Sequence, residues 1–363
     1  MPQAKTHKPR FFGLAYLAIA ALVLFGADRL AASWAHREIA SGRFSFAKSS
    51  VALADEFLAY AAASPSPTAV FLGDSVVRGA HQSAEHALPA LLESRLRAAT
   101  DAAWTVHNFG LTAANNSDKL ILLRRLVLDR GARPDLVVVA DNIKFYSEAF
   151  AVQTARYPAL VTSEMWERDG DYYASRLGLA RPAERALWPA PERAARRLAT
   201  HFFLFANRED IAARLTGDHP VRLGLAAVNR VRRTFAGEGE DKVRKESDRR
   251  HFRVPPENIE PDALNIRALA EIAALCRERS IPLFVYLTPL DLTHGLASQA
   301  FDLKTLARFA ESARDAADLP AGRFFVLYTL LKDGMFRDLD HPTDEGLALL
   351  ADALTERIAE TLP

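Results

Sequence analysis

Cysteine is nearly absent from this chain, which has one, Cys276, among its 363 residues. A single thiol excludes an intramolecular disulfide and a thiolate metal cluster. An excess of one charge is lacking too, since 46 basic and 45 acidic residues leave a formal net charge of +1. A near-neutral chain gives no reason to expect a nucleic acid as partner. No group of His, Asp and Glu residues has metal-ligand spacing, so we expect neither a metal nor another cofactor.

The remaining composition is that of a globular protein, with 49% hydrophobic and 25% charged residues. This length predicts one large domain or a domain with a substantial insertion. Cys276 shares the apolar face of a predicted helix with Ile266, Leu269 and Ala273, which predicts that its thiol lies in the core. Buried apolar thiols are normally inert, so we do not expect a reactive cysteine.

The N-terminus combines basic residues with a long apolar stretch. The basic residues of the first ten are Lys5, Lys8 and Arg10. Residues 11–34 follow, with no charge before Asp28, and they reach the roughly 20 residues that a helix needs to cross a bilayer. Basic residues ahead of a span favour a cytoplasmic N-terminus. We therefore predict a cytoplasmic tail at 1–10, a transmembrane helix at 11–34, and the remainder outside the cytoplasm, in the periplasm of a bacterial inner-membrane protein.

A cleavable signal peptide is the alternative to this single-pass anchor, because its apolar region has a similar length. The small residues near Ala31 and Ser33 offer only a poor cleavage site. A helical connector is expected at 35–67, where a helix from Phe44 to Ala63 ends at the turn Ser64–Pro67.

Strands and helices alternate after this turn. Thr68–Leu72, Trp104–Phe109 and the valine-rich Asp135–Ala140 are predicted strands, the last typical of a sheet covered on both faces. The helices between them are predicted from apolar residues on one face, Leu88, Leu91, Leu92 and Leu96, and from a stretch 117–130 that ends before Gly131.

The alternation stops after Asn142. About residues 143–258 contain helical stretches without a convincing strand, and this length predicts an inserted helical subdomain. Gly237–Arg253 is dense in charges of both signs. We interpret it as a solvated loop, with a basic docking site for an anionic glycan or headgroup as the alternative.

The alternation then resumes with a helix at 262–279, a strand at 282–287, a helix at 303–317, a strand at 324–328 and a helix at 343–361. Strand–helix repeats with right-handed crossovers predict an α/β fold with a parallel five-stranded sheet. Ligands of such sheets bind beyond the carboxyl ends of the strands, so residues that follow each strand are the candidates for chemistry.

Four such positions carry polar groups suited to acyl chemistry. Ser75, in Gly73-Asp74-Ser75, follows the first strand at a strand-to-helix turn, and Gly110 follows the second with a backbone N–H that can approach an oxyanion. Asn142 follows the third and offers a side-chain amide. After the fifth strand, Asp338 stands three residues before His341, where a carboxylate can orient an imidazole that takes a serine proton.

These four blocks resemble those of the SGNH (GDSL-type) hydrolase superfamily over residues 68–363. The resemblance implies a flavodoxin-like three-layer α/β/α sandwich. It implies Ser75 as nucleophile, His341 as general base oriented by Asp338, and the backbone amides of Ser75 and Gly110 with the Asn142 side chain as oxyanion donors. The third block departs from the family pattern, because Ala140 and Ile143 replace the flanking Gly and Asp.

Other residues compete for these roles. Asp340 and Asp344 are rival carboxylates, although the family's Asp-x-x-His spacing selects Asp338. His81, His107 and His294 are rival bases, but no carboxylate precedes them at that spacing.

The favoured function is an exported, membrane-anchored serine esterase or O-acyltransferase that acts on acyl esters of cell-envelope carbohydrate through an acyl-serine intermediate. One span followed by an SGNH domain resembles the exported partners of membrane-bound O-acyltransferases, including lipoteichoic-acid D-alanylation and alginate acetylation proteins. Its expected partners are an acylated glycan or small ester, the membrane, and such an acyltransferase.

Two alternatives stay open. A lysophospholipase or thioesterase would use aromatics of the insertion as an acyl groove, and these are Phe145, Tyr146, Phe150, Phe202, Phe203 and Phe205. Apolar residues are buried by default, so the insertion's own core is the favoured interpretation of these residues. A catalytically inert binding or scaffold protein is the other, although the chain retains Ser75, Asp338 and His341.

Overall fold

The computed structural model describes residues 11–40, 54–79, 82–151, 155, 157, 160–179, 248–320 and 322–362. The first ten residues, the first half of the predicted 44–63 helix, His81, and residues 180–247 of the predicted insertion lie outside these ranges. So do Phe202, Phe203 and Phe205, together with most of the predicted charged loop at 237–253.

Five strands form one parallel sheet in the order β2-β1-β3-β4-β5. The strands are β1 (Thr68–Gly73), β2 (Thr105–Gly110), β3 (Leu136–Asp141), β4 (Leu283–Leu287) and β5 (Phe324–Val326). The predicted five-stranded parallel sheet is thus confirmed, and its order is that of flavodoxin-like folds. The fifth strand is shorter than predicted and ends at Val326.

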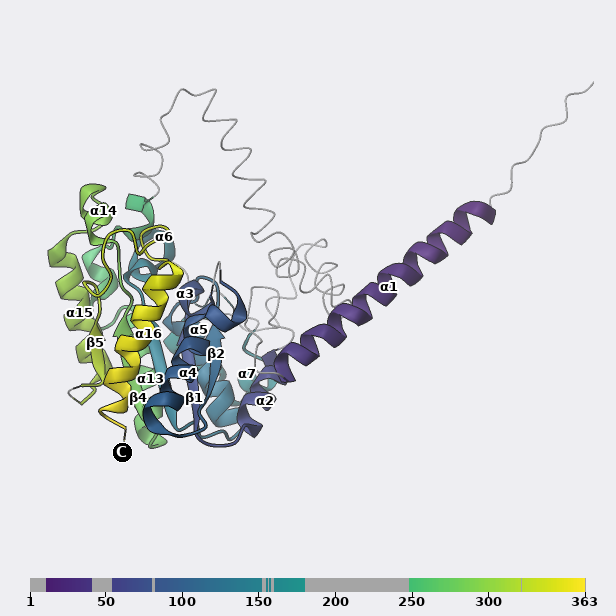
Figure 1. Ribbon diagram of the computed structural model, residues 1–363, viewed down its shortest axis with the longest axis horizontal. Helices are drawn as coiled ribbons and strands as arrows, with labels where there is room; N and C mark the ends of the chain where they lie inside the picture. The colour runs from purple at the N-terminus through teal and green to yellow at the C-terminus, as the bar shows by residue number, and fades with distance from the viewer. Residues whose placement is uncertain are drawn as a thin grey trace, which may run out of the picture.

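Helices cover both faces of the sheet (Figure 1). One face packs against α4 (Leu88–Thr100) and α16 (Asp344–Ala359), and the other against α2 (Ala54–Ala63), α5 (Asn116–Arg124), α13 (Leu264–Glu278) and α15 (Leu303–Ala317). Alternate residues of a strand point to opposite faces. In β3, Val137 and Val139 therefore enter one core and Leu136 and Val138 the other. Both faces of this central strand are buried, which explains its uninterrupted apolar run.

The remaining described elements are shorter or lie outside the sandwich. They are α1 (Phe11–Ala40), α3 (Ser75–Arg78), η2 (Ala84–His86), η3 (Arg125–Asp129), η4 (Ile143–Tyr146), α6 (Glu148–Ala151), α7 (Ser163–Leu177), η7 (Pro256–Ile259) and α14 (Leu292–Ala297). The helix predicted at 117–130 is divided, because α5 passes into the π-helical turn η3 before Gly131.

Helix α1 projects from the α/β body (Figure 1). In the part of the chain that the structure describes, no helix combines the length and apolarity needed to cross a membrane. The side chains of residues 11–18 lie outside that part, so the span at 11–34 stays a prediction.

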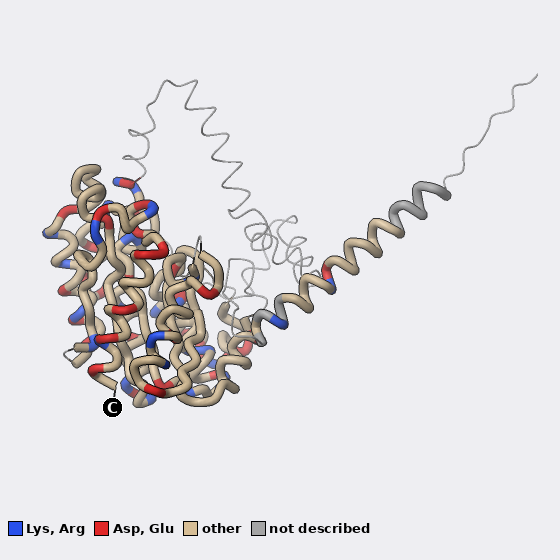
Figure 2. The backbone as a smooth tube through the Cα atoms, in the orientation of Figure 1, with Lys and Arg blue, Asp and Glu red and all other residues tan. Residues whose placement is uncertain are grey.

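Charges of both signs are interspersed over the body (Figure 2). This distribution agrees with the formal net charge of +1. Cys276 is buried on α13, as predicted, and burial raises the pKa of its thiol to about 12. A thiol with such a pKa stays protonated and unreactive at neutral pH.

Candidate active site

Ser75 stands at the turn between β1 and α3. Asp74 caps this short helix, since its Oδ1 accepts the N–H of Val76 at 2.9 Å. The turn is tight because Gly73 lies against Val77, where a Cβ on the glycine would be 2.2 Å from Val77 Cγ2. The buried serine is thereby fixed at the carboxyl edge of the sheet.

His341 is the partner of Ser75. Its Nε2 lies 2.8 Å from Ser75 Oγ, although 266 positions separate the two residues. Its Nδ1 lies 2.9 Å from both Oδ1 and Oδ2 of Asp338. The structure thus brings the three predicted catalytic residues together in the order serine, imidazole, carboxylate, which is the arrangement of a serine hydrolase triad.

The loop that carries His341 is organised by the same carboxylate. Asp338 Oδ1 accepts the backbone N–H of His341 at 2.8 Å and that of Asp340 at 3.1 Å. Across the loop, the N–H of Arg337 donates to the carbonyl of His341 at 2.8 Å. The rival carboxylate Asp344 instead pairs with Arg337 at 2.8 Å, away from the imidazole.

A second carboxylate approaches the imidazole. Asp340 Oδ1 is 3.3 Å from His341 Nδ1, and the Asp340 side chain is only 3% exposed. Lys144 Nζ lies 3.1 Å from Asp340 Oδ2 and 3.3 Å from Oδ1. Sequence reasoning treated Asp340 only as a rival of Asp338 and missed Lys144 entirely, because 196 residues separate the lysine from its partner and no motif marks it.

These charges set the protonation of the site. Burial lowers the pKa of His341, but the carboxylates of Asp340 and Asp338 outweigh burial and raise it to about 10. Burial raises the pKa of Asp338, but the hydrogen bond and charge of His341, together with the hydrogen bond from the Asp340 N–H, lower it overall. For Asp340, burial likewise acts upward, but the charges and hydrogen bonds of Lys144 and His341 together outweigh it, so its pKa falls well below the usual range. Both carboxylates are therefore ionised beside a strongly basic imidazole.

The oxyanion donors assigned by resemblance lie at the same sheet edge. The Gly110 N–H donates to Asn108 Oδ1 at 2.9 Å. Asn142 Nδ2 donates to Asp74 Oδ2 at 3.2 Å and to Asp340 Oδ2 at 3.0 Å. Both groups are bonded within the protein in this structure, so an oxyanion would have to replace these acceptors. Their catalytic role stays a prediction.

Neither described rival histidine contacts Ser75. His107 is buried and forms T-shaped ring contacts with Phe57 and Tyr60. His294 Nε2 lies 3.1 Å from Asp248 Oδ2.

The aromatics of the insertion that the structure describes belong to a core. Phe145 and Tyr146 are buried, and Phe150 packs against that core. The Tyr146 hydroxyl donates to Asp141 Oδ2 at 2.8 Å. These contacts favour the packing interpretation over an acyl groove for the described members of the set.

Asp338, Asp340 and His341 have ligand atoms that all lie within 4.8 Å of one another, close enough to hold a metal ion. Their atoms already have partners, however. Lys144 neutralises Asp340, and Nε2 of His341 faces Ser75. This donor set suits proton transfer better than cation binding.

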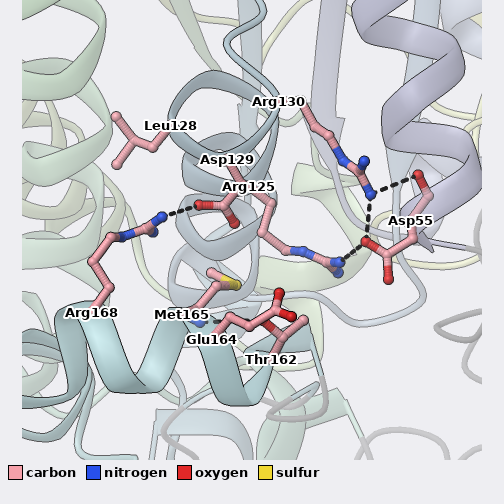
Figure 3. Close-up of a pocket in the computed structure, with 9 residues that line it drawn as sticks. All are labelled: Asp55, Arg125, Leu128, Asp129, Arg130, Thr162, Glu164, Met165 and Arg168. Carbon is pink, nitrogen blue, oxygen red and sulfur yellow. Dashed lines mark hydrogen bonds and ion pairs between the residues drawn. The ribbon is translucent and has the colours of Figure 1, made fainter.

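A cavity of about 320 Å³ lies elsewhere, between α2, η3 and α7 (Figure 3). Its lining is Asp55, Arg125, Leu128, Asp129, Arg130, Thr162, Glu164, Met165 and Arg168. Three arginines and three acids balance in charge, and each guanidinium faces a carboxylate. Since η3 precedes β3, the cavity lies toward the amino ends of the strands, opposite Ser75.

No protein-family model matches the chain, and no curated protein matches its sequence. Solved structures that resemble it include TesA, at 15% identity over 80% of this chain and 97% of that one, with a TM-score of 0.36. An alpha/beta hydrolase enzyme from the metagenome of Lake Arreo, Spain, has 13% identity over 84% and 99%, with a TM-score of 0.41. A catalytic mutant of Axe2, an acetylxylan esterase from Geobacillus stearothermophilus, has 11% identity over 82% and 96%, with a TM-score of 0.40.

Proposed function

We propose that this chain is a serine-nucleophile ester hydrolase or O-acyltransferase of the SGNH type. The observation that carries the proposal is the contact chain from Ser75 Oγ to His341 Nε2, at 2.8 Å, and from His341 Nδ1 to Asp338, at 2.9 Å. A hydroxyl bonded to an imidazole that a carboxylate orients is the arrangement that activates a serine as nucleophile.

In the proposed reaction, the neutral form of His341, which the raised pKa makes the minor form near pH 7, accepts the Ser75 proton as Oγ attacks the carbonyl carbon of an ester. The tetrahedral oxyanion is held by the Ser75 and Gly110 amides and by Asn142, the last two exchanging their internal acceptors for it. The imidazolium then gives its proton to the departing alcohol, which leaves an acyl-serine. Water, or the hydroxyl of an acceptor, attacks that ester with His341 again as base, and Ser75 is regenerated.

The proposed substrate is an acyl ester of cell-envelope carbohydrate, and the proposed location is the outer side of a bacterial inner membrane. This location rests on residues 11–34. Several large apolar side chains of α1 are exposed, namely Ile19, Leu22, Val23, Leu24, Phe25 and Leu30. A bilayer would cover such an apolar surface. An acyltransferase in the same membrane is the proposed partner, supported only by the resemblance of the domain arrangement.

A fluorophosphonate probe tests the nucleophile on the full chain in detergent. We expect labelling of the wild type and none of Ser75→Ala, whose missing hydroxyl should leave the thermal unfolding midpoint nearly unchanged. Equal labelling of both proteins, or of neither, would refute a serine hydrolase.

Two substrates test the carbohydrate proposal. Release of acetate from an acetylated glycan without turnover of long-chain esters would support it. The reverse preference would indicate the lipid hydrolase instead. An inert scaffold would turn over neither and would resist the probe.

A further inference from the structure

The imidazole of His341 has one nitrogen that faces three carboxylate oxygens. Two belong to Asp338 at 2.9 Å, and the third is Oδ1 of Asp340 at 3.3 Å. The two acids differ in environment, because the side chain of Asp338 is 50% exposed and that of Asp340 is 3% exposed. A buried charge interacts more strongly with its neighbours than a solvated one. The charge of Asp340 should therefore act strongly on the imidazole of His341.

Asp340 also connects its own loop to the segment that follows β3. It precedes His341 directly, it pairs with Lys144 after β3, and its Oδ2 accepts from Asn142 Nδ2 at 3.0 Å. The same amide donates to Asp74 at 3.2 Å, and Asp74 caps the helix that begins at Ser75. The position of the base relative to the nucleophile is thus fixed through Asp340 and Asn142.

We infer that Asp340 is a second carboxylate positioning residue for His341, with Lys144 as its counter-charge, and that the pair tunes the base of the triad. The inference rests on the proposed function of Ser75 and His341. Asp338 keeps the orienting role, while the Asp340–Lys144 pair sets how firmly the imidazole holds its proton.

The charges around the imidazole determine in which direction each substitution should shift the pKa of His341. The ionisable groups that act on the imidazole are Asp340 and Asp338, on its own loop. Lys144, after β3, pairs with Asp340, and the charge of Asp74, after β1, acts on Lys144. Removing the negative charge of Asp340 makes the imidazolium less stable and lowers the pKa of His341. Removing the positive charge of Lys144 leaves Asp340 uncompensated and favours the imidazolium further. A purely structural role would not move the two variants in opposite directions.

Titration of His341 by NMR tests this on the full chain in detergent with isotope-labelled histidine. His341→Gln identifies the resonance among the 10 histidines. We expect Asp340→Asn to lower the pKa of His341 by about 1–3 pH units and Lys144→Met to raise it. The control is Asp344→Asn, whose acid pairs with Arg337 and not with the imidazole; it should leave the pKa unchanged.

The inference fails if Asp340→Asn titrates like Asp344→Asn, or if Lys144→Met lowers the pKa. Asp340→Asn leaves Lys144 without its partner and so carries a risk of misfolding. The double variant Asp340→Asn with Lys144→Met removes both charges and should still titrate below the wild type; a pKa equal to that of the wild type would overturn the inference.

The rate of fluorophosphonate labelling against pH gives a second readout. Labelling requires neutral His341, so its acidic limb should shift down in Asp340→Asn and up in Lys144→Met, and an unshifted limb in both would contradict the inference. If the wild type is never labelled, the proposed function fails, while the NMR titration still decides the role of Asp340.

Discussion

Gly110 lies against the backbone of Arg78 so closely that a Cβ on the glycine would be 2.2 Å from the Arg78 nitrogen. Arg78 is the last residue of α3, and Ser75 is the first. The end of β2 therefore sets the position of the helix that begins with Ser75. Backbone atoms on both sides leave no flexible group to yield to a larger residue.

This contact predicts that Gly110→Ala displaces α3. We expect a loss of labelling at Ser75 of at least about tenfold, together with a lower thermal unfolding midpoint, because overpacking at a rigid contact typically costs about 1–3 kcal/mol.

Gly131→Ala is the control for this variant. Gly131 has a φ of +65° with no atom within 4 Å of an added Cβ. Its substitution should cost roughly 1–2 kcal/mol of backbone strain but leave labelling intact. Full reactivity in Gly110→Ala would show that α3 tolerates the displacement.

Asp338→Asn should inactivate the triad without unfolding its loop. An asparagine keeps an oxygen for the N–H groups of Asp340 and His341, which Asp338 Oδ1 now accepts. Its amide, however, favours the imidazole tautomer that cannot take the serine proton. We expect labelling to slow by up to roughly 10⁴-fold with a wild-type circular dichroism spectrum. Labelling within a few-fold of the wild type would assign the orienting role elsewhere.

Acid should destabilise the protein through His107. Burial lowers the pKa of this imidazole to about 4, against an unfolded value near 6.5. The unfolded chain then binds the proton first, so stability is complete above about pH 6.5 and falls as the pH drops toward 4. The full effect is roughly 3 kcal/mol.

Urea unfolding at pH 7 and pH 4.5 measures this loss. His107→Phe keeps a ring beside Phe57 and Tyr60 but has no imidazole to protonate, so it should lose less stability between pH 7 and pH 4.5 than the wild type does. His86→Gln, which removes an exposed histidine, should behave as the wild type does. An unchanged acid loss in His107→Phe would assign the effect to other groups.

The stability of the protein should depend on the ion pair between Arg125 and Asp55. Arg125 is 4% exposed and lies 2.6 Å from Asp55. Figure 3 shows the two side chains pointing toward one another. Asp55→Asn would leave the guanidinium buried without its counter-ion, at an expected cost of roughly 1–3 kcal/mol in the free energy of unfolding.

Asp352→Asn is the matched control for Asp55→Asn. The two acids have similar exposure, 64% for Asp55 and 60% for Asp352, but Arg95, the partner of Asp352, is 25% exposed. Exposed pairs contribute about 0–1 kcal/mol, so this variant should change urea unfolding little. Equal losses in the two variants would show that burial of Arg125 has no role.

The strands and the main helices were predictable because their signals are local. A run such as Leu136–Val139 has the composition of a doubly covered strand, and α15 repeats apolar residues at helical spacing. The division of the helix after Arg124 was not predictable, since a π-helical turn has no distinctive residue pattern. The end of β5 at Val326 depends on where β4 stops pairing with it.

The candidate site was also predictable only where its signals are local. Asp338 and His341 are three residues apart, and Ser75 follows a recognisable strand, so both halves were visible in the chain. Asp340 and Lys144 meet across 196 residues, and His107 lies in a sheet that α2 covers. Such neighbours are created by packing and leave no trace in local spacing.

The sequence by itself determined the parallel α/β sandwich, the polar residues at the carboxyl ends of its strands, and Ser75 as the nucleophile candidate. Only the tertiary structure decided that a second, buried carboxylate faces His341, that Lys144 neutralises it, and that Asn142 connects it to Asp74. The physical reason is that a parallel sheet gathers the ends of distant strands at one edge, where charges are paired by proximity and burial rather than by order along the chain.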